Sequence, residues 1–398
     1  MPEDPGSRAQ PLRRNALANV AGRGVSALLW VLVTPYALSR LGQERFAVWS
    51  LFFVFGGYVA TLDLGMANTV SRFVAVGTAR GDRLSIVSVL RRSLSVSAGL
   101  GLVWGVACVL LRAPLMRAFH VPPALEPEVA RSLIVFAFAL LAFSVTQVLN
   151  GSLIGFQRLD LSNLAFLAGL LVNTTILVAA LAAGAGLPGA AAAMVAGHLC
   201  TGTLSAALTR RLIRRMPQSS ATETVRWSEL LRFSGAVQAT AACAVGQLQV
   251  AKVLLGVLGR LVWVTQFELG FRVANAVWSL PTLVQVAVIP ASAHASAAGG
   301  RAGVRAVYDW ACRWIFALAG VTLAGLWLAA PALVTLWLGP GHEPAVAVTR
   351  ALAVTFAVAT VSGPATAVAR GGGWPRRATT SCSSSARPSR ARRPVATG

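Results

Sequence analysis

Long apolar stretches recur along the chain and are separated by short polar gaps. The stretches 133–153 and 161–183 each run for more than 20 residues without a charged side chain. Crossing about 30 Å of hydrocarbon takes roughly 20 apolar residues in a helix. Ten stretches have this character: 17–38, 46–66, 93–111, 132–154, 161–183, 188–208, 234–257, 263–289, 312–334 and 345–368. The pattern predicts an all-α polytopic membrane helix bundle of about ten transmembrane helices.

Arginines concentrate in every second gap. The N-terminal segment and the even-numbered gaps hold 18 of them: Arg8, Arg13, Arg14, Arg72, Arg80, Arg83, Arg91, Arg92, Arg158, Arg210, Arg211, Arg214, Arg215, Arg226, Arg232, Arg301, Arg305 and Arg313. The odd-numbered gaps hold seven: Arg40, Arg45, Arg112, Arg117, Arg131, Arg260 and Arg350. Because cytoplasmic loops are enriched in basic residues, this split predicts a cytoplasmic N-terminus.

The polar connections also predict the domain organisation. The longest connection divides the spans into six and four. We expect a cytoplasmic N-terminal segment, an N-terminal lobe of about six helices, a cytoplasmic linker, an incomplete C-terminal lobe of about four helices, and a basic tail too poor in apolar residues to fold. The expected ranges, in that order, are 1–14, 15–215, 216–232, 233–370 and 371–398.

Composition supports the membrane interpretation. Of the 398 residues, 56% are hydrophobic and 12% are charged, against roughly 25% charged in soluble domains. The net charge of +22 would suit nucleic-acid binding, but the arginines lie between apolar spans, where they indicate topology. We therefore expect membrane lipids and no nucleic acid as partners. The five cysteines form no CxxC pair, so we expect neither a metal site nor a disulfide framework.

Motifs of soluble catalysis are missing from the sequence. There is no GxxxxGK[ST] phosphate loop, HExxH or GxSxG. The only lysine, Lys252, is followed by Val253. We therefore expect neither an ATPase nor a hydrolase, and we assign no catalytic residue, cofactor or metal.

A few charged residues interrupt the spans or lie at their edges: Arg23, Asp63, Lys252, Glu268 and Arg272. A charge within the hydrocarbon is costly unless it is paired or hydrated, so such residues mark functional sites. The three basic residues would make a cationic cavity for an anionic head group, and the two acids are candidates for ion coupling. Structural alternatives stay open. Glu268 and Arg272 are spaced to pair on one helix, Asp63 could cap or bend its helix, and Arg23 and Lys252 could extend to the interface.

Uncharged polar residues also fall within the spans, and sugar hydroxyls would require such donors and acceptors. The candidates for lining a polar cavity are Asn68, Gln147, Asn150, Gln247 and Gln249. Asn19, Asn173, Gln238 and Asn275 are of the same kind. The alternative is that these side chains make hydrogen bonds between helices.

Several motifs together resemble a known family. The first is the segment 15–42 followed by Phe46-Ala-Val-Trp49 and the Leu62-Asp-Leu-Gly65 turn, and the second is the segment 151–163 with its Gly-Phe-Gln-Arg-Leu-Asp core. The third comprises the segments 249–259, 268–275 and 279–281, and the fourth comprises Leu336-Trp-Leu-Gly339 and Gly363-Pro…Arg370. Their order and spacing, from about Asn15 to Arg370, resemble the polysaccharide biosynthesis proteins. These are oligosaccharide-lipid flippases of the multidrug/oligosaccharidyl-lipid/polysaccharide exporter (MOP) superfamily.

This resemblance implies two six-helix lobes around a central cavity in the bacterial cytoplasmic (inner) membrane. It implies that undecaprenyl-diphosphate-linked oligosaccharide is flipped by alternating access, for polysaccharide or O-antigen (lipopolysaccharide) export. The diphosphate would bind Arg23, Lys252 and Arg272. The protein would act as a monomer, with polysaccharide assembly proteins as partners.

The sequence departs from the family in two places. Where the family often carries an acid before the lysine of span seven, this chain has Ala251. The family also continues beyond the Gly363–Arg370 motif with further spans, so we expect a reading-frame shift near Gly371 that removes the last helices.

Three alternatives to the flippase remain. A drug or small-cation exporter of the same superfamily would favour an acidic cavity. A membrane glycosyltransferase or polymerase would need a larger outer loop than 112–131. An inactive truncated remnant is the third.

Overall fold

The structure, a computed structural model, describes residues 5–62, 66–217, 250–298 and 300–371. No strand occurs among these residues, which confirms the predicted all-α class. Within the same ranges, seven helices are long and apolar enough to cross a membrane. The total of ten spans stays a prediction.

The chain divides into two compact units, Met1–Glu268 and Leu269–Gly398, here called unit 1 and unit 2. The boundary falls inside one helix, α9 (Leu261–Ala298), which begins in unit 1 and continues into unit 2. The linker expected at 216–232 lies almost entirely outside the described residues, and so does the tail beyond Gly371. The predicted domain boundaries therefore stay predictions.

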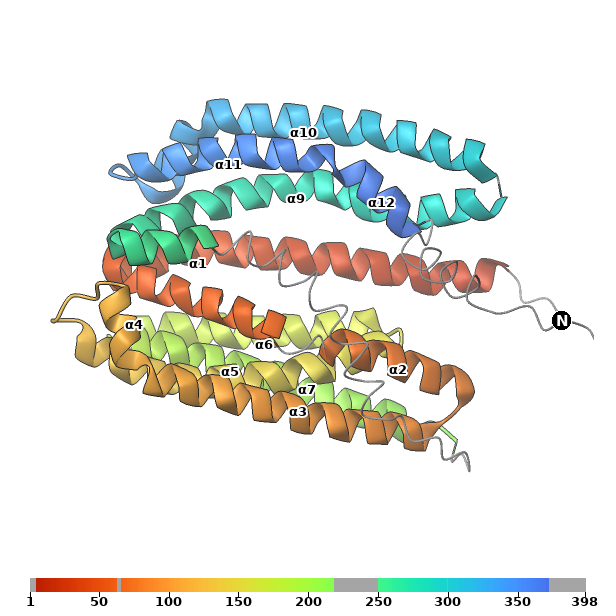
Figure 1. The fold of residues 1–398 in the computed structure, drawn as a ribbon, viewed down its shortest axis with the longest axis horizontal. Coiled ribbons are helices and arrows are strands. Elements are labelled where there is room, and N and C mark those ends of the chain that lie inside the picture. Colours follow the sequence, from red (N-terminus) through yellow and green to blue (C-terminus); the bar gives the residue numbers. More distant parts are fainter. Residues whose placement is uncertain (1–4, 63–65, 218–249, 299, 372–398) are drawn as a thin grey trace, which may run out of the picture. The chain divides into compact units, whose positions relative to one another are not determined.

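Unit 1 is a bundle of antiparallel helices (Figure 1). Its described elements are α1 (Pro5–Leu62), α2 (Met66–Arg80), α3 (Arg83–Leu110), α4 (Arg112–Ala118), α5 (Glu126–Gly155), α6 (Leu159–Ala182), α7 (Gly186–Arg214), a helical segment over 250–258, and the start of α9. Within the bundle, α5 packs against α3 and α7, and α6 packs against α7 and α1.

α1 is two helices joined at a kink. Gly42 has φ 73° and ψ 171°, a conformation that glycine adopts without the steric cost that a side chain would add. The helix therefore turns back at Gly42. This agrees with the polar gap expected between the stretches 17–38 and 46–66.

The two faces of α3 show how the bundle meets its surroundings. Small residues recur every fourth position on the buried face: Ser93, Ser97, Gly101 and Gly105. A Cβ added at Gly101 would lie 3.0 Å from the Cα of Leu141, so the backbones of α3 and α5 approach closely, as small residues permit in membrane helices. Large apolar side chains on the other face, among them Leu102 and Val103, are exposed. Their exposure is favourable only in lipid.

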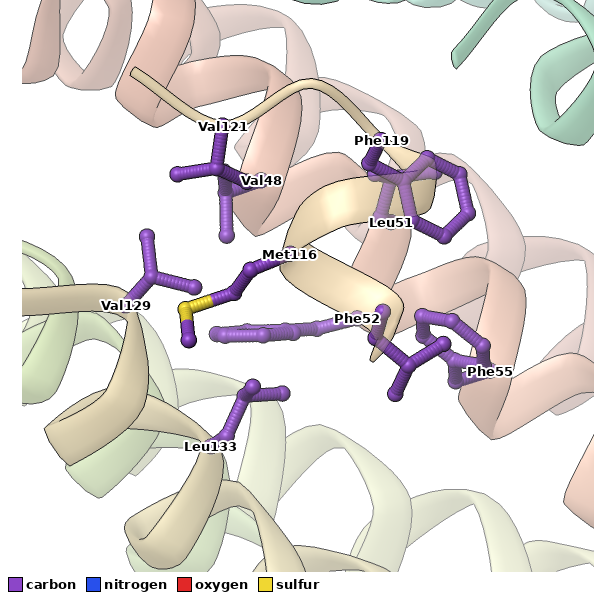
Figure 2. A pocket seen from close by; sticks show the side chains of 10 residues that line it. Val48, Leu51, Phe52, Phe55, Met116, Phe119, Val121, Val129 and Leu133 are labelled. Carbon is purple, nitrogen blue, oxygen red and sulfur yellow. The ribbon is translucent and has the colours of Figure 1, made fainter. Parts of the chain in front are cut away.

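The short helix α4 closes one end of unit 1. Its Met116 points into a small apolar pocket toward Phe52 of α1 and Leu133 of α5 (Figure 2). Phe119 follows α4 and meets Phe55 edge to face at 6.2 Å. The apolar pattern predicts only an outer loop over 112–131. Part of this connection is helical because α4 covers apolar side chains, such as Phe52, that would otherwise be exposed.

The turn between α5 and α6 lies at the opposite end of α5. There Arg158 donates from Nε and Nη2 to the two carboxylate oxygens of Asp160, at 2.9 Å each. This hydrogen bonding raises the pKa of Arg158 above its ordinary value. The pair fixes the first turn of α6 at the arginine-rich end of the bundle.

Unit 2 contains the rest of α9 with α10 (Gly300–Leu338), α11 (Glu343–Val361) and α12 (Gly363–Gly371). Trp278 of α9 stacks on Phe356 of α11 at 4.5 Å, and its Nε1 donates to Oγ1 of Thr360 at 3.3 Å. Arg350 of α11 donates to the carbonyl of Trp327 on α10 at 3.1 Å and lies over that residue's ring. Aromatic packing therefore holds the helices of unit 2 together.

Candidate functional site

A cavity lies within unit 1, among α1, α5, α6 and α7, and apolar atoms make up most of its lining surface. We call it the polar cavity after the amides and hydroxyls among its lining residues. Four aromatic rings, several amides and hydroxyls, and one imidazole surround it. The lining residues are Trp30, Phe53, Phe143, Thr146, Gln147, Asn150, Phe166, Gly169, Leu170, Asn173, Met194, Gly197, His198 and Thr201. None of these described lining residues is a carboxylate, a lysine or an arginine, so the cavity suits an uncharged ligand with both apolar and polar groups.

Aromatic side chains form one side of the polar cavity. The Trp30 ring lies 5.2 Å from that of Phe53 in an edge-to-face arrangement. Trp49 lies 6.0 Å from Trp30 and 5.2 Å from Phe53, and it is fully buried behind them. Edge-to-face contacts of this kind fix ring orientation. The arrangement presents a rigid aromatic surface to the cavity.

Hydrogen bonds fix part of the polar side. The Oγ of Ser162 on α6 donates to Oδ1 of Asn150 on α5 at 2.7 Å. The Oγ1 of Thr146 on α5 donates to the carbonyl oxygen of His198 on α7 at 3.0 Å. The His198 ring lies 5.2 Å from Phe143. These contacts tie three helices together around the polar cavity and orient the amide of Asn150.

Two glycines bring α6 and α7 together beside the polar cavity. A Cβ at Gly169 would lie 2.5 Å from the carbonyl oxygen of Gly197 and would collide with Oγ1 of Thr201. A Cβ at Gly197 would lie 2.7 Å from the Cβ of Asn173. Only glycine fits this crossing. The close approach places Asn173 and His198 on the same cavity wall.

A buried ion pair lies elsewhere in unit 1, between the segment 250–258 and the start of α9. Lys252 Nζ contacts Glu268 Oε2 at 2.5 Å, with the side chains only 4% and 7% exposed. One turn earlier on α9, Oγ1 of Thr265 donates to the carbonyl oxygen of Gln43 at 2.6 Å, next to the Gly42 kink. The start of α9 is therefore held in unit 1 by a charge pair and a hydrogen bond.

The structure brings some predicted residues together and separates others. Gln147 and Asn150 line the polar cavity, whereas Asn68 is exposed on α2 and does not line it. Lys252 and Glu268 contact each other, so the lysine charge is balanced by that carboxylate in this conformation. Whether these residues bind substrate or couple ions stays a prediction.

For the remaining predicted site residues, the structure gives at most the location and the degree of burial. Arg272 is half-buried on α9 in unit 2. Arg23 lies on α1, but the structure does not describe its side chain. Asp63, Gln247 and Gln249 lie outside the described residues.

Sequence reasoning did not select several cavity residues. Asn173 was recognised as a polar residue in a span, but nothing in the sequence distinguished it from the others. His198 and the aromatic rings of Trp30 and Phe143 were missed. Their signal was weak because aromatic residues in apolar spans are usually part of the packing. Among the described residues, no group of three or more His, Cys, Asp or Glu side chains could hold a metal ion.

Comparison with known proteins places the chain in a family. Residues 12–296 match the family described as polysaccharide biosynthesis protein. No match to a curated protein sequence is found.

Solved structures share the fold. The inward-facing conformation of a multidrug resistance MATE family transporter of the MOP superfamily aligns with a TM-score of 0.74 and 19% identity, over 87% of this chain and 81% of that one. The outward-facing conformation of a multidrug resistance MATE family transporter of the MOP superfamily aligns with a TM-score of 0.67 and 19% identity, over 93% of this chain and 84% of that one. A MOP superfamily transporter from Pyrococcus furiosus, described as having a binding pocket of reverse polarity, aligns with a TM-score of 0.63 and 18% identity, over 93% and 83%. The chain therefore belongs to the polysaccharide biosynthesis protein family and has the fold of the MOP superfamily transporters.

Proposed function

We propose that this protein is a flippase that moves an undecaprenyl-diphosphate-linked oligosaccharide across the bacterial cytoplasmic membrane by alternating access. The observation that supports this proposal is the polar cavity, because its described lining combines amides and aromatic rings without a carboxylate. Membership of the polysaccharide biosynthesis family agrees with a sugar-containing substrate.

The chemistry of the polar cavity matches that of a sugar. Each sugar hydroxyl is both a donor and an acceptor, and an Asn or Gln amide offers two donors and an acceptor. Gln147 and Asn173 supply such amides from α5 and α6. Trp30 and Phe53 supply flat apolar surfaces for the C–H faces of a sugar ring. Ligand sites commonly combine apolar walls with a few oriented polar groups.

The diphosphate needs cationic partners, and we keep Arg23, Lys252 and Arg272 as the proposed ones. Glu268 already balances Lys252. A diphosphate could bind Lys252 only by replacing that carboxylate, which would link substrate binding to the state of the ion pair. Asp63 and Glu268 remain the proposed residues for ion coupling. Replacing Lys252 or Arg272 with Ala should abolish translocation while leaving membrane insertion intact.

Export of a drug or another small molecule is the second candidate function. It is favoured by the fold, since two of the aligned structures are described as multidrug resistance MATE family transporters. The transporter from Pyrococcus furiosus, with its reverse-polarity pocket, indicates that pocket polarity differs among proteins of this fold. An organic cation would gain most from a carboxylate in the cavity wall.

Complementation of a flippase-deficient bacterial strain tests the leading proposal. Asn173→Leu removes an amide from the cavity wall on α6, and Thr175→Val removes a hydroxyl from the exposed face of the same helix. We expect Asn173→Leu to reduce surface polysaccharide at least tenfold and Thr175→Val to change it less than twofold, at equal membrane levels of protein. Equal activity of the two variants would reject the polar cavity as the sugar site.

A further inference from the structure

An open hollow of about 930 Å³ lies at the end of unit 1 that is opposite the Arg158 turn. We call it the arginine hollow. Its charged lining residues are Arg40, Arg45, Glu128 and Arg131, and the turn 184–188 completes it. These residues come from the α1 kink, the start of α5 and the α6–α7 turn, so the fold gathers them from distant parts of the sequence.

The single carboxylate among the described residues of the arginine hollow is already engaged. Oε2 of Glu128 accepts from Nε of Arg45 at 2.7 Å. Its Oε1 accepts from the backbone N–H of Leu187, in the first turn of α7, at 2.9 Å. Glu128 therefore balances one arginine and caps a helix. No ion pair joins the other two guanidinium groups to a carboxylate among the residues that the structure describes.

Those two guanidinium groups are held without an acid. Arg40 lies over the ring of Tyr36, 5.6 Å from its centroid. Nε of Arg131 donates to the carbonyl of Pro127, on its own helix, at 3.2 Å. Neither contacts a carboxylate within the described part of the chain. Like charges facing one hollow repel each other, so an anion there would be stabilised.

The location also argues for a ligand. Arginine is scarce at this end of the bundle, which the arginine distribution predicts to face outward. Three of the seven arginines of the odd-numbered gaps nevertheless converge on this hollow. A role in topology does not explain that convergence, because topology would favour placing them at the other end.

We propose that the arginine hollow binds a phosphate group, and that Arg40 and Arg131 are its main ligands. A planar guanidinium group can donate two parallel hydrogen bonds to phosphate oxygens. The hollow lies near Gly42, where the apolar stretch 17–38 of α1 has ended, and Tyr36 lies close to it. Tyrosine is enriched where membrane helices meet the lipid head groups, so a head group is a suitable carrier of the phosphate. The phosphate could be carried by a lipid head group or be free in solution. This site is independent of the transported substrate.

The test is ligand binding by the purified full chain in detergent. The probes are dioctanoyl phosphatidylglycerol, dioctanoylglycerol as a phosphate-free control, and inorganic phosphate. The site variant is Arg40→Gln/Arg131→Gln. The matched control, Arg112→Gln/Arg117→Gln, removes the same charge from exposed positions on α4, outside the hollow. A third variant, Arg40→Lys/Arg131→Lys, keeps the charge but not the paired donors.

We expect the wild type and the α4 control to bind dioctanoyl phosphatidylglycerol alike, and the site variant to bind it at least tenfold more weakly. The affinity of the lysine variant for dioctanoyl phosphatidylglycerol should lie between that of the wild type and that of the site variant. Dioctanoylglycerol should bind all four proteins equally weakly. Binding of the lipid without comparable binding of inorganic phosphate would assign the site to a head group, and the reverse would assign it to the free anion. Equal affinity in the site variant and the α4 control would overturn the proposal. Because no transport is measured, failure here would leave the flippase proposal untouched.

Discussion

Lys252 and Glu268 show at the scale of single residues how this chain tolerates charge inside an apolar bundle. Each ion alone would lose its hydration at a cost of several kcal/mol. Their contact at 2.5 Å, with both side chains almost fully buried, offsets much of that cost. Removing one partner is therefore worse than removing both, because it leaves the other charge buried.

Single and double replacements of this pair test that argument. Lys252→Met or Glu268→Gln alone should lower the free energy of unfolding by about 3 kcal/mol. The double variant should lose less than either single variant. Thermal unfolding in detergent, followed by the loss of helical circular dichroism, measures all four proteins. Additive losses in the double variant would show that the two side chains are energetically independent.

The sequence identified these residues but not their pairing. A charge in an apolar span stands out in any sequence, which is why Lys252 and Glu268 were both selected. Helical spacing suggested Arg272 as the partner of Glu268, because only contacts within one helix can be inferred from spacing. The contact with Lys252 depends on how two helices pack. Gln147 and Asn150 were selected in the same way, and the aromatic residues beside them were not.

At the scale of elements, the crossing of α6 and α7 decides the shape of the polar cavity. Gly169 and Gly197 allow backbone contact there, and larger residues would force the helices apart. In lipid this packing replaces the hydrophobic effect as the main attraction between helices. The stability of unit 1 should therefore depend strongly on the size of the residues at this crossing.

A pair of glycine substitutions measures this sensitivity. Gly169→Ala should lower the free energy of unfolding by about 1–3 kcal/mol, the usual cost of overpacking, because its Cβ would meet Gly197 and Thr201. Gly99→Ala on α3 is the matched control, since a Cβ there meets nothing within 4 Å. It should leave stability unchanged or raise it slightly. The account of the crossing fails if both variants unfold at the same temperature as the wild type.

The helices were predictable where apolar runs were long, and their ends were not. The stretches 132–154 and 161–183 lie within or close to α5 and α6, whereas α7 continues past the apolar stretch through Arg210 and Arg211 to Arg214. Backbone hydrogen bonding extends a helix beyond the membrane as long as no residue stops it. The helix α4 was missed because its reason for forming is tertiary, namely the aromatic pocket that it covers (Figure 2).

For the whole molecule, orientation in the membrane is a separate prediction from the fold. The arginine distribution predicts that the turn between α2 and α3 faces the cytoplasm and that the α6–α7 turn faces outward. In a variant without its natural cysteines, Ala185→Cys should react with a membrane-impermeant maleimide added outside intact spheroplasts. Ala79→Cys should react only after the membrane is opened. Both positions are exposed in the structure. The opposite labelling pattern would contradict the predicted topology and show that the N-terminus faces outward.

The fold class was predictable because a bilayer demands long apolar helices, whatever the protein transports. The substrate is not determined in that way, because proteins of this fold differ in the polarity of their pockets. The flippase proposal therefore depends on the polar cavity of unit 1, where amides and aromatic rings from four helices meet.

The most direct measurement is translocation by the full chain reconstituted in liposomes. A fluorescent undecaprenyl-diphosphate-linked oligosaccharide and a cationic dye are assayed in parallel, with proton and sodium gradients imposed in turn. We predict that the glycolipid crosses at least tenfold faster than in protein-free liposomes, that Asn173→Leu abolishes most of this gain, and that the dye crosses no faster than in protein-free liposomes. Transport of the dye without movement of the glycolipid would contradict the account and identify the protein as a small-molecule exporter.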